Sequence, residues 1–596
     1  MLPAVPERAV DELGRTEGGP ETLGLLVRDQ HTRRLLLLRA VLDAAGSAAP
    51  DVCPATALTR LREDWSLLEE AERLEPSARR RGRPRGAGPG ERRPEGFVPV
   101  SGWPGGSAPV SGRLPASAPG PGWPGGSVRA HGQPHGLAPE SETLDGSAPV
   151  SAPVPAPEYG SDWSPSPSPS SSVSVPEGPY GPGGFPVAAE EDPAAGNRPP
   201  PSPVRDLLLH PFIGPWARDT LRTLGAGTGP LPARAAREQA RALAHFGALA
   251  AVAAARAGVS YAVRLTAHDG VLTLPSLGAL RTGGSGSGAT EVAVAHRRGR
   301  LTFRVRGEVD VVVRLQSGAG AWSEAAAWTS AYTLPGLVPG SAAVPLDDLD
   351  PYRTARGGPR PDTLSGPAAL DDADRKHWLH TWSGTAAALA TAGERRLAES
   401  VTLLRCLVPL AAPSGSVPGG AGGSCSGTRR EAFGAVLSSA PATPTAFAAT
   451  LVHEIQHTKL AALSDMMTLH HAGPAARHFA PWRPDPRPYD GLLQGAYSHL
   501  ALADFFQRGA LAATLPTRRD AAWAQHARYQ AQVGAVLPAL VGSGDLTVRG
   551  RRFVDRMVEV YETLAEQPPP RGHAARATAY VQAARALWNR RHAPGE

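Results

Sequence analysis

Apolar residues recur at helical spacing near the start of this chain, over residues 22–46 and 55–74. The first run ends at Gly46, and glycine commonly follows the last turn of a helix. We therefore predict an N-terminal helical element over residues 1–76 that packs on the main body of the protein.

The helical periodicity stops at about Pro76 and returns only at Val204. Pro, Gly, Ser and Ala dominate the interval, and the sequence Gly-Trp-Pro-Gly-Gly-Ser at 102–107 recurs at 122–127. Such a composition cannot bury enough apolar surface to offset the entropy lost on ordering. We predict a disordered Pro/Gly/Ser-rich insert over 77–203, and we favour repeat slippage over a recognition motif for the two Trp-Pro-Gly-Gly copies.

The apolar period changes to two between residues 258 and 335, directly after an alanine-rich helical run at 234–257. The expected strands are 259–265, 270–274, 290–295, 301–305 and 309–315. Glycine-rich turns separate them, and residues 295–301 have the composition of a hairpin. We expect an antiparallel sheet here.

Helical spacing then predominates up to the C-terminus. The expected helices are 372–404, 447–463, 490–514, 518–541, 550–566 and 573–590. Trp378 and Trp382 lie one turn apart and are expected in the core. The predicted fold class is α+β, mainly helical, with residues 204–596 forming one catalytic domain that is sheet-rich over 258–335 and helical over 372–596.

The strongest chemical signal is the sequence His-Glu-Ile-Gln-His at 453–457, inside one of these helices. Histidines at positions i and i+4 lie on one helix face, where both can bind one metal ion. Glu454 lies about 100° around the helix from His453, in a position to reach a metal-bound water. We predict His453 and His457 as metal ligands and Glu454 as a catalytic residue.

The third ligand cannot follow the usual zinc-peptidase patterns. No glutamate occurs between Glu454 and Glu559, and Leu460 and Leu463 stand where a metzincin has Gly and His. His499, on the apolar face of the helix predicted from 490, is therefore the predicted third ligand. Asp465 is the reserve candidate.

A proline-rich loop at 479–489 separates the two helices and carries Arg483 and Arg487. Proline stiffens the loop, and an arginine fork binds a carboxylate through two parallel hydrogen bonds. We predict these arginines as cofactor-binding residues; the alternative is that they bind backbone carbonyls. The acidic sequence 346–353 lacks calcium-binding spacing, and we predict a capped loop there.

The remaining composition restricts the class of protein. Net charge is only +6 over 596 residues and no basic stripe with interleaved aromatics occurs, so no nucleic-acid partner is expected. Cys53, Cys406 and Cys425 are too far apart for a thiolate metal site. No run is long and apolar enough to span a membrane, and the start lacks the features of a signal peptide, so we expect a cytoplasmic protein without a membrane partner.

Three segments together resemble a known family. They are residues 453–463 (HEIQHTKLAAL), 480–488 (APWRPDPRP) and 491–501 (GLLQGAYSHLA), with further likeness at 346–353, 431–435 and 33–43. They look like the HExxH-type peptide beta-hydroxylases, which depend on iron(II) and 2-oxoglutarate. The resemblance covers most of the chain outside the insert.

The resemblance implies hydroxylation at a beta-carbon of a residue in a ribosomally made precursor peptide. It implies Fe(II) on the two motif histidines and a third ligand, with 2-oxoglutarate chelating the iron, and a radical-SAM maturase as a partner. Spacing alone does not distinguish iron from zinc. A zinc metallopeptidase and a non-catalytic protein that binds the precursor peptide therefore stay open as alternatives.

Overall fold

The computed structural model describes residues 5–81, 207, 210–225, 231–283, 288–316, 320–354, 366–412, 425–475 and 477–592. The fold is α+β, as predicted. Almost all of the predicted insert over 77–203 lies outside the described residues. The exception is residues 77–81, in which the third helix continues past the predicted boundary.

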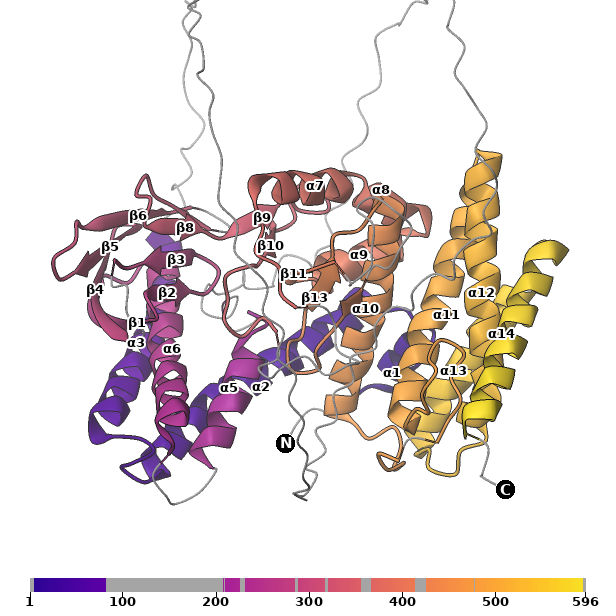
Figure 1. The fold of residues 1–596 in the computed structure, drawn as a ribbon, viewed down its shortest axis with the longest axis horizontal. Coiled ribbons are helices and arrows are strands. Elements are labelled where there is room, and N and C mark those ends of the chain that lie inside the picture. The colour runs from indigo at the N-terminus through magenta and orange to yellow at the C-terminus, as the bar shows by residue number, and fades with distance from the viewer. Residues whose placement is uncertain are drawn as a thin grey trace, which may run out of the picture. The chain divides into compact units, whose positions relative to one another are not determined.

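Three helices form the N-terminal part of the fold (Figure 1): α1 (Glu7–Gly14), α2 (Pro20–Ser47) and α3 (Ala55–Arg81). Helices α2 and α3 were predicted, whereas the eight-residue α1 was not. Its buried residues Ala9, Val10 and Leu13 lie on one face, and α1 packs against α13 near the C-terminus. A helix this short depends on such tertiary packing more than on local propensity.

The predicted antiparallel sheet is present and contains eight strands within the described residues, in the order β7-β6-β5-β4-β1-β2-β3-β8. The strands are β1 (Tyr261–His268), β2 (Val271–Leu274), β3 (Gly278–Arg281), β4 (Ala289–Arg297), β5 (Arg300–Val305), β6 (Val311–Leu315), β7 (Ala321–Trp322) and β8 (Trp328–Ser330). Arg298 and Gly299 have φ of 51° and 74° in the β4–β5 hairpin. Positive φ at both central residues suits the right-handed twist of the paired strands.

Helix α6 (Ala233–Arg256) packs on this sheet and contacts β1 and β2 (Figure 1). Its C-terminal half, from His245 to Ala255, is buried throughout because it lies between the sheet and α5 (Ile213–Leu224). Alanine suits this position, since small side chains allow close approach on every side of the helix.

A second sheet of five described strands was not predicted, apart from a short strand or turn at 408–410. It comprises β9 (Tyr332–Leu334), β10 (Val344–Leu346), β11 (Cys406–Leu410), β12 (Ser426–Gly427) and β13 (Ala435–Ser439), in the order β12-β13-β11-β10-β9. The β10–β11 and β11–β13 pairs are parallel. Every residue of β11 and β13 is buried, so neither strand shows the alternation that identifies a half-exposed strand.

The predicted helix over 372–404 is wrong in extent. The structure has three helices there, α7 (Asp372–Ser383), α8 (Thr385–Thr391) and α9 (Glu394–Leu403). Gly384 lies at the first break, and Gly393, with φ of 110°, lies at the second. The core placement of Trp378 and Trp382 is confirmed, since both rings pack edge-on against Phe447 at 5.4 Å.

The C-terminal helices agree with the predictions to within a few residues. They are α10 (Pro444–Met466), α11 (Tyr489–Ala512), α12 (Pro516–Val541), α13 (Val548–Ala565) and α14 (Arg571–His592). Helix α11 packs against α10, α12 and α13, and α14 packs against α12 (Figure 1). On its other side, α10 contacts strands β12 and β13 of the five-stranded sheet.

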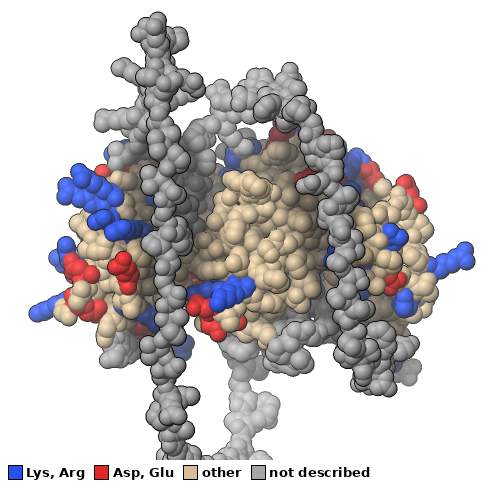
Figure 2. Space-filling view, turned by 90° about the horizontal axis from the view of Figure 1, so that it is seen from above, with Lys and Arg blue, Asp and Glu red and all other residues tan. Residues whose placement is uncertain are grey.

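The five-stranded sheet separates two hydrophobic clusters. Leu407 and Val436 pack with the bundle on one face, whereas Cys406, Ala435 and Leu437 pack with α5, α6 and the larger sheet on the other. On the face shown in Figure 2, acidic and basic side chains are interspersed, and a largely uncharged region lies between the charged areas. No described helix is long and apolar enough to cross a membrane.

Candidate metal centre

Helix α10 positions the His-Glu-Ile-Gln-His sequence in the interior. Thr443 caps the helix by accepting a 3.1 Å hydrogen bond from the Ala446 amide, and Pro444 occupies the first turn. His453, Glu454 and His457 are each at most 5% exposed. The motif therefore lies on a helix, as predicted, and faces the protein core.

The two motif histidines meet through their Nε2 atoms, which are 3.0 Å apart. Two donor atoms bound to one zinc- or iron-sized ion at about 2.1 Å lie roughly 3.0–3.5 Å apart. Burial lowers the pKa of both imidazoles, which keeps them in the neutral form that binds metals. This donor pair fits a transition-metal ion.

Gln494 fixes the orientation of one of these rings. Its Oε1 atom lies 3.1 Å from Nδ1 of His457. Because an amide oxygen can only accept, Nδ1 carries the proton and Nε2 keeps its lone pair toward His453. A hydrogen bond to the far nitrogen is the usual support for a metal-binding histidine.

His499 lies next to this pair, with its ring 5.5 Å from that of His453. It is packed edge-on against Trp482 at 4.5 Å and Tyr529 at 5.1 Å. Burial lowers its pKa to about 3, so the ring is neutral. The ligand nitrogens of the three imidazoles do not all lie within 4.8 Å of one another. One other group of described residues does meet that spacing and is described below. Binding of one ion by all three requires the His499 ring to shift toward the other two imidazoles.

The reserve candidate Asp465 lies apart from the histidines and has other partners. Its Oδ1 accepts from Arg430 at 2.8 Å, and its Oδ2 accepts from Gln30 at 3.2 Å. This carboxylate ties α10 to α2 and to the connection between β12 and β13.

Two glycines on α11 let the proline-rich loop lie directly on the helix. A Cβ atom at Gly491 would be 2.8 Å from the Arg487 guanidinium, and one at Gly495 would be 2.5 Å from the Trp482 indole. Both positions therefore require glycine, because a side chain at either one would collide with the loop. Arg487, Trp482 and His499 therefore lie along successive turns of α11.

Of the two predicted arginines, Arg487 is the one placed near the histidines. It is half-buried, and its positive charge contributes to lowering the pKa of His457, after the larger effect of burial. No described carboxylate forms an ion pair within 4.0 Å of the Arg487 guanidinium, and its buried Nε has no described hydrogen-bond partner. Arg483 contributes to lowering the pKa of Arg487 but not to the pKa shift of His457 or His499. The structure thus offers Arg487 as an anion-binding group.

Glu454 points to the five-stranded sheet. Its Oε1 accepts a 2.7 Å hydrogen bond from Ser426 on β12, and Thr428 also bonds to the carboxyl. Burial raises its pKa to about 8.

Several residues at this site were not predicted. Gln494, Trp482 and Tyr529 support the histidine rings, and Ser426 supports Glu454. Gln494 and Trp482 lie inside the segments that carry the family resemblance, and membership of those segments was the sequence signal that could have identified them. For Ser426, 28 residues before Glu454, no sequence signal pointed to the contact.

Below the motif, α10 carries a buried ionic network. Lys459 is fully buried and donates to Glu399 at 2.8 Å and to the carbonyl of Thr16 at 3.0 Å. Arg396 bonds to the same carbonyl, and also to Asp504 on α11 at 3.1 Å. The network joins the α1–α2 connection, α9, α10 and α11 one turn below the histidines.

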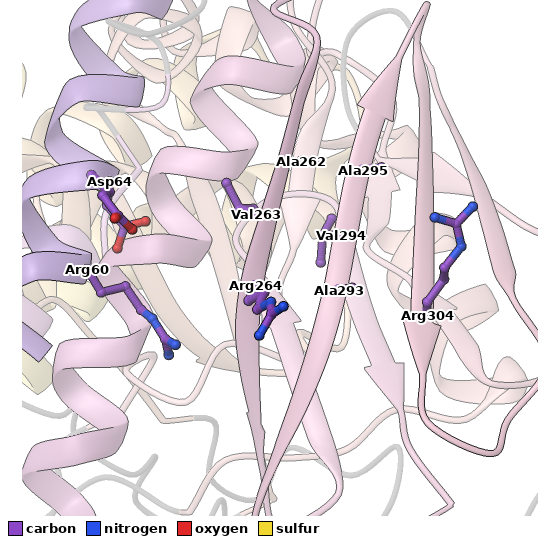
Figure 3. Close-up of a pocket in the computed structure, with 10 residues that line it drawn as sticks. Arg60, Asp64, Ala262, Val263, Arg264, Ala293, Val294, Ala295 and Arg304 are labelled. Carbon is purple, nitrogen blue, oxygen red and sulfur yellow. The ribbon is translucent and has the colours of Figure 1, made fainter. Parts of the chain in front are cut away.

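A cavity of about 530 Å³ lies elsewhere, between α3 and the larger sheet (Figure 3). Arg60 and Asp64 on α3 face strand β1, which carries Arg264. Burial raises the pKa of Asp64 to about 7. None of the lining residues belongs to α10 or α11, so this cavity is separate from the histidine site.

A second group of metal-ligand residues comprises His210, Asp347 and Asp350. It is the group of described residues whose ligand atoms all lie within 4.8 Å of one another. The capped loop predicted at 346–353 is present, since Asp347 Oδ1 accepts from the amides of Leu349 and Asp350.

Comparison with known proteins adds no assignment. No protein-family model matches the chain, and no curated protein matches it significantly.

Proposed function

We propose that this protein is an iron(II)- and 2-oxoglutarate-dependent hydroxylase that acts at a beta-carbon of a residue in a ribosomally made precursor peptide. The observation that carries the proposal is the pair of neutral, buried His453 and His457 nitrogens 3.0 Å apart. The guanidinium of Arg487, which acts electrostatically on His457 and has no ion-pair partner among the described residues, supports it. The resemblance of three segments to the HExxH-type peptide beta-hydroxylases supplies the reaction class.

His453 and His457 would hold the iron, and His499 is the proposed third ligand. Bound iron with 2-oxoglutarate and O2 supplies the oxidising power: one oxygen atom enters the C–H bond of the peptide, and the other enters succinate as CO2 leaves. Arg487 is proposed to bind the distal carboxylate of 2-oxoglutarate, because an arginine fork matches a carboxylate and no described acid occupies it. Gln494 keeps the His457 lone pair directed at the metal position.

The state of Glu454 favours this reaction over peptide hydrolysis. A metallopeptidase needs this glutamate ionised as a general base toward metal-bound water. Here Ser426 and Thr428 both donate hydrogen bonds to the carboxyl and hold it toward the five-stranded sheet. A carboxyl held in this way suits a supporting role in positioning α10.

The test is 2-oxoglutarate turnover by the purified full-length chain with Fe(II) and O2, read as succinate formation. We expect succinate even without peptide, at a slow uncoupled rate, and none from His453→Ala. Arg487→Leu is expected to raise the KM for 2-oxoglutarate by roughly 10- to 100-fold, from the loss of about 1.5–3 kcal/mol of charged hydrogen bonding. Arg477→Leu, at an exposed arginine in the same connection between α10 and α11, is the matched control and should leave KM unchanged.

Glu454→Gln separates the two enzyme classes. The amide oxygen can still accept from Ser426, so a hydroxylase should keep most of its turnover. Zinc-dependent peptide cleavage that is lost in Glu454→Gln and needs no 2-oxoglutarate would establish a metallopeptidase. Absence of both activities, with metal-independent binding of a precursor peptide, would establish a binding protein.

A further inference from the structure

His210, Asp347 and Asp350 converge in the interior from two distant parts of the chain. His210 precedes α5, and the two aspartates lie in the turn that follows β10. His210 and Asp350 are buried, with exposed fractions of 8% and 1%, and the side chain of Asp347 is 10% exposed. Nε2 of His210 lies 3.9 Å from Oδ2 of Asp347, too far for a direct hydrogen bond.

This group lies on the face of the five-stranded sheet opposite α10. Asp347 donates its amide to the carbonyl of Leu407, next to Cys406, and the charges of both aspartates raise the pKa of the Cys406 thiol, after the larger effect of burial. Cys406 packs in the cluster with α5 and α6, whereas Leu407 packs with α10. The group is therefore separate from His453 and His457.

The loop holds the carboxylates in place through its own backbone. Oδ1 of Asp347 accepts from the amides of Leu349 at 2.9 Å and Asp350 at 2.8 Å. Oδ1 of Asp350 accepts from the amide of Tyr352 at 2.7 Å. The second oxygen of Asp347 stays directed at His210. A backbone-supported ligand of this kind is typical of a preorganised metal site.

No described basic side chain pairs with Asp347. Arg353 influences Asp347 electrostatically but directs its Nη1 to the backbone carbonyl of Asp350, 2.7 Å away. No described Arg or Lys forms an ion pair with Asp347 within 4.0 Å, and a buried carboxylate without a cationic partner favours the binding of a cation.

We propose that His210, Asp347 and Asp350 bind a divalent first-row metal ion that joins the segment before α5 to the end of β10. One imidazole nitrogen and two carboxylate oxygens form a donor set that suits Mn²⁺ or Zn²⁺. Two ligands of such an ion lie roughly 3.0–3.5 Å apart, so binding draws His210 and Asp347 together by about half an ångström. The metal is structural, because it connects two parts of the core.

The experiment counts metal in a chain whose other site has been removed. His453→Ala/His457→Ala is titrated with Zn²⁺ or Mn²⁺ alone, by calorimetry and by metal analysis after dialysis. We expect about one equivalent to remain, and a melting temperature that rises with the metal. Adding Asp347→Asn should weaken metal binding at least tenfold. The asparagine keeps a side-chain oxygen that can accept from the backbone amides of the loop, but it lacks the negative charge.

Asp348→Asn is the matched control in the same loop, because Asp348 accepts from Leu370 and faces Arg375 instead of His210. It should leave the affinity unchanged. His210→Asn tests the site from outside the loop and should weaken binding as Asp347→Asn does. A folded His453→Ala/His457→Ala chain that binds neither metal would overturn the proposal, as would an affinity equal in Asp347→Asn and Asp348→Asn. Neither result depends on whether 2-oxoglutarate is turned over.

Discussion

Replacing Lys459 by methionine tests how the ionic network holds the metal helix in place. Lys459 is fully buried and bonds to Glu399 and to the carbonyl of Thr16. Methionine fills a similar volume without the charge. Glu399, itself 1% exposed, then keeps Arg396 as its remaining ion-pair partner among the described residues, with Nη1 3.3 Å away.

The expected loss of stability follows from this orphaned carboxylate. Breaking a buried ion pair by removing one partner costs about 3–5 kcal/mol. Because Arg396 remains beside Glu399, we expect the lower end, about 3 kcal/mol. With a slope of about 3 kcal/mol per molar urea, the unfolding midpoint should fall by roughly 1 M.

Urea unfolding followed by far-UV circular dichroism measures this shift. The control is Arg39→Met, which breaks the i,i+4 pair of Arg39 with Asp43 in which both side chains are more than half exposed. Exposed pairs of this kind contribute about 0.3–0.5 kcal/mol, so its midpoint should barely move.

A double variant separates lost attraction from orphaned charge. Adding Glu399→Gln to Lys459→Met removes the unbalanced carboxylate, so most of the stability should return. The reasoning is refuted if Lys459→Met unfolds at the wild-type midpoint. It is also refuted if the double variant is less stable than the wild type by the sum of the losses of the two single variants.

Two further predictions concern packing and pH. Gly550→Ala should destabilise the protein by about 1–3 kcal/mol, because the new Cβ would lie 1.8 Å from the carbonyl oxygen of Leu469. The control Gly509→Ala, which places its Cβ in open space on α11, should stabilise the protein by about 0.5–1 kcal/mol. Thermal melts of the two variants measure both effects. Asp64 has a folded-state pKa of about 7 against 3.8 for the free group, so its favourable contribution is complete below pH 4 and is lost as pH rises through 7. Asp64→Asn should therefore match the wild type at pH 4 and exceed it by up to about 4 kcal/mol at pH 9, and equal stability at both pH values would contradict the assigned burial effect.

The helices and the larger sheet were predictable because their signals are local. The apolar period of α10, α11 and α13 gave their positions to within a few residues, and positive-φ residues suited to a tight turn marked the β4–β5 hairpin. The five-stranded sheet escaped prediction because β11 and β13 are buried on both faces and pair in parallel across intervening chain. Gly384 and Gly393 divide a helical pattern that by composition alone reads as continuous.

The sequence by itself determined that His453 and His457 share one face of a helix, since a spacing of four residues fixes that geometry wherever the helix lies. Only the tertiary structure decided the chemistry around them: Ser426 holds Glu454, Gln494 orients His457, and Arg487 lies near the pair. It also brought His210 to Asp347, more than a hundred residues away. Contacts of this kind depend on how buried elements pack in three dimensions, and a one-dimensional pattern carries no record of that packing.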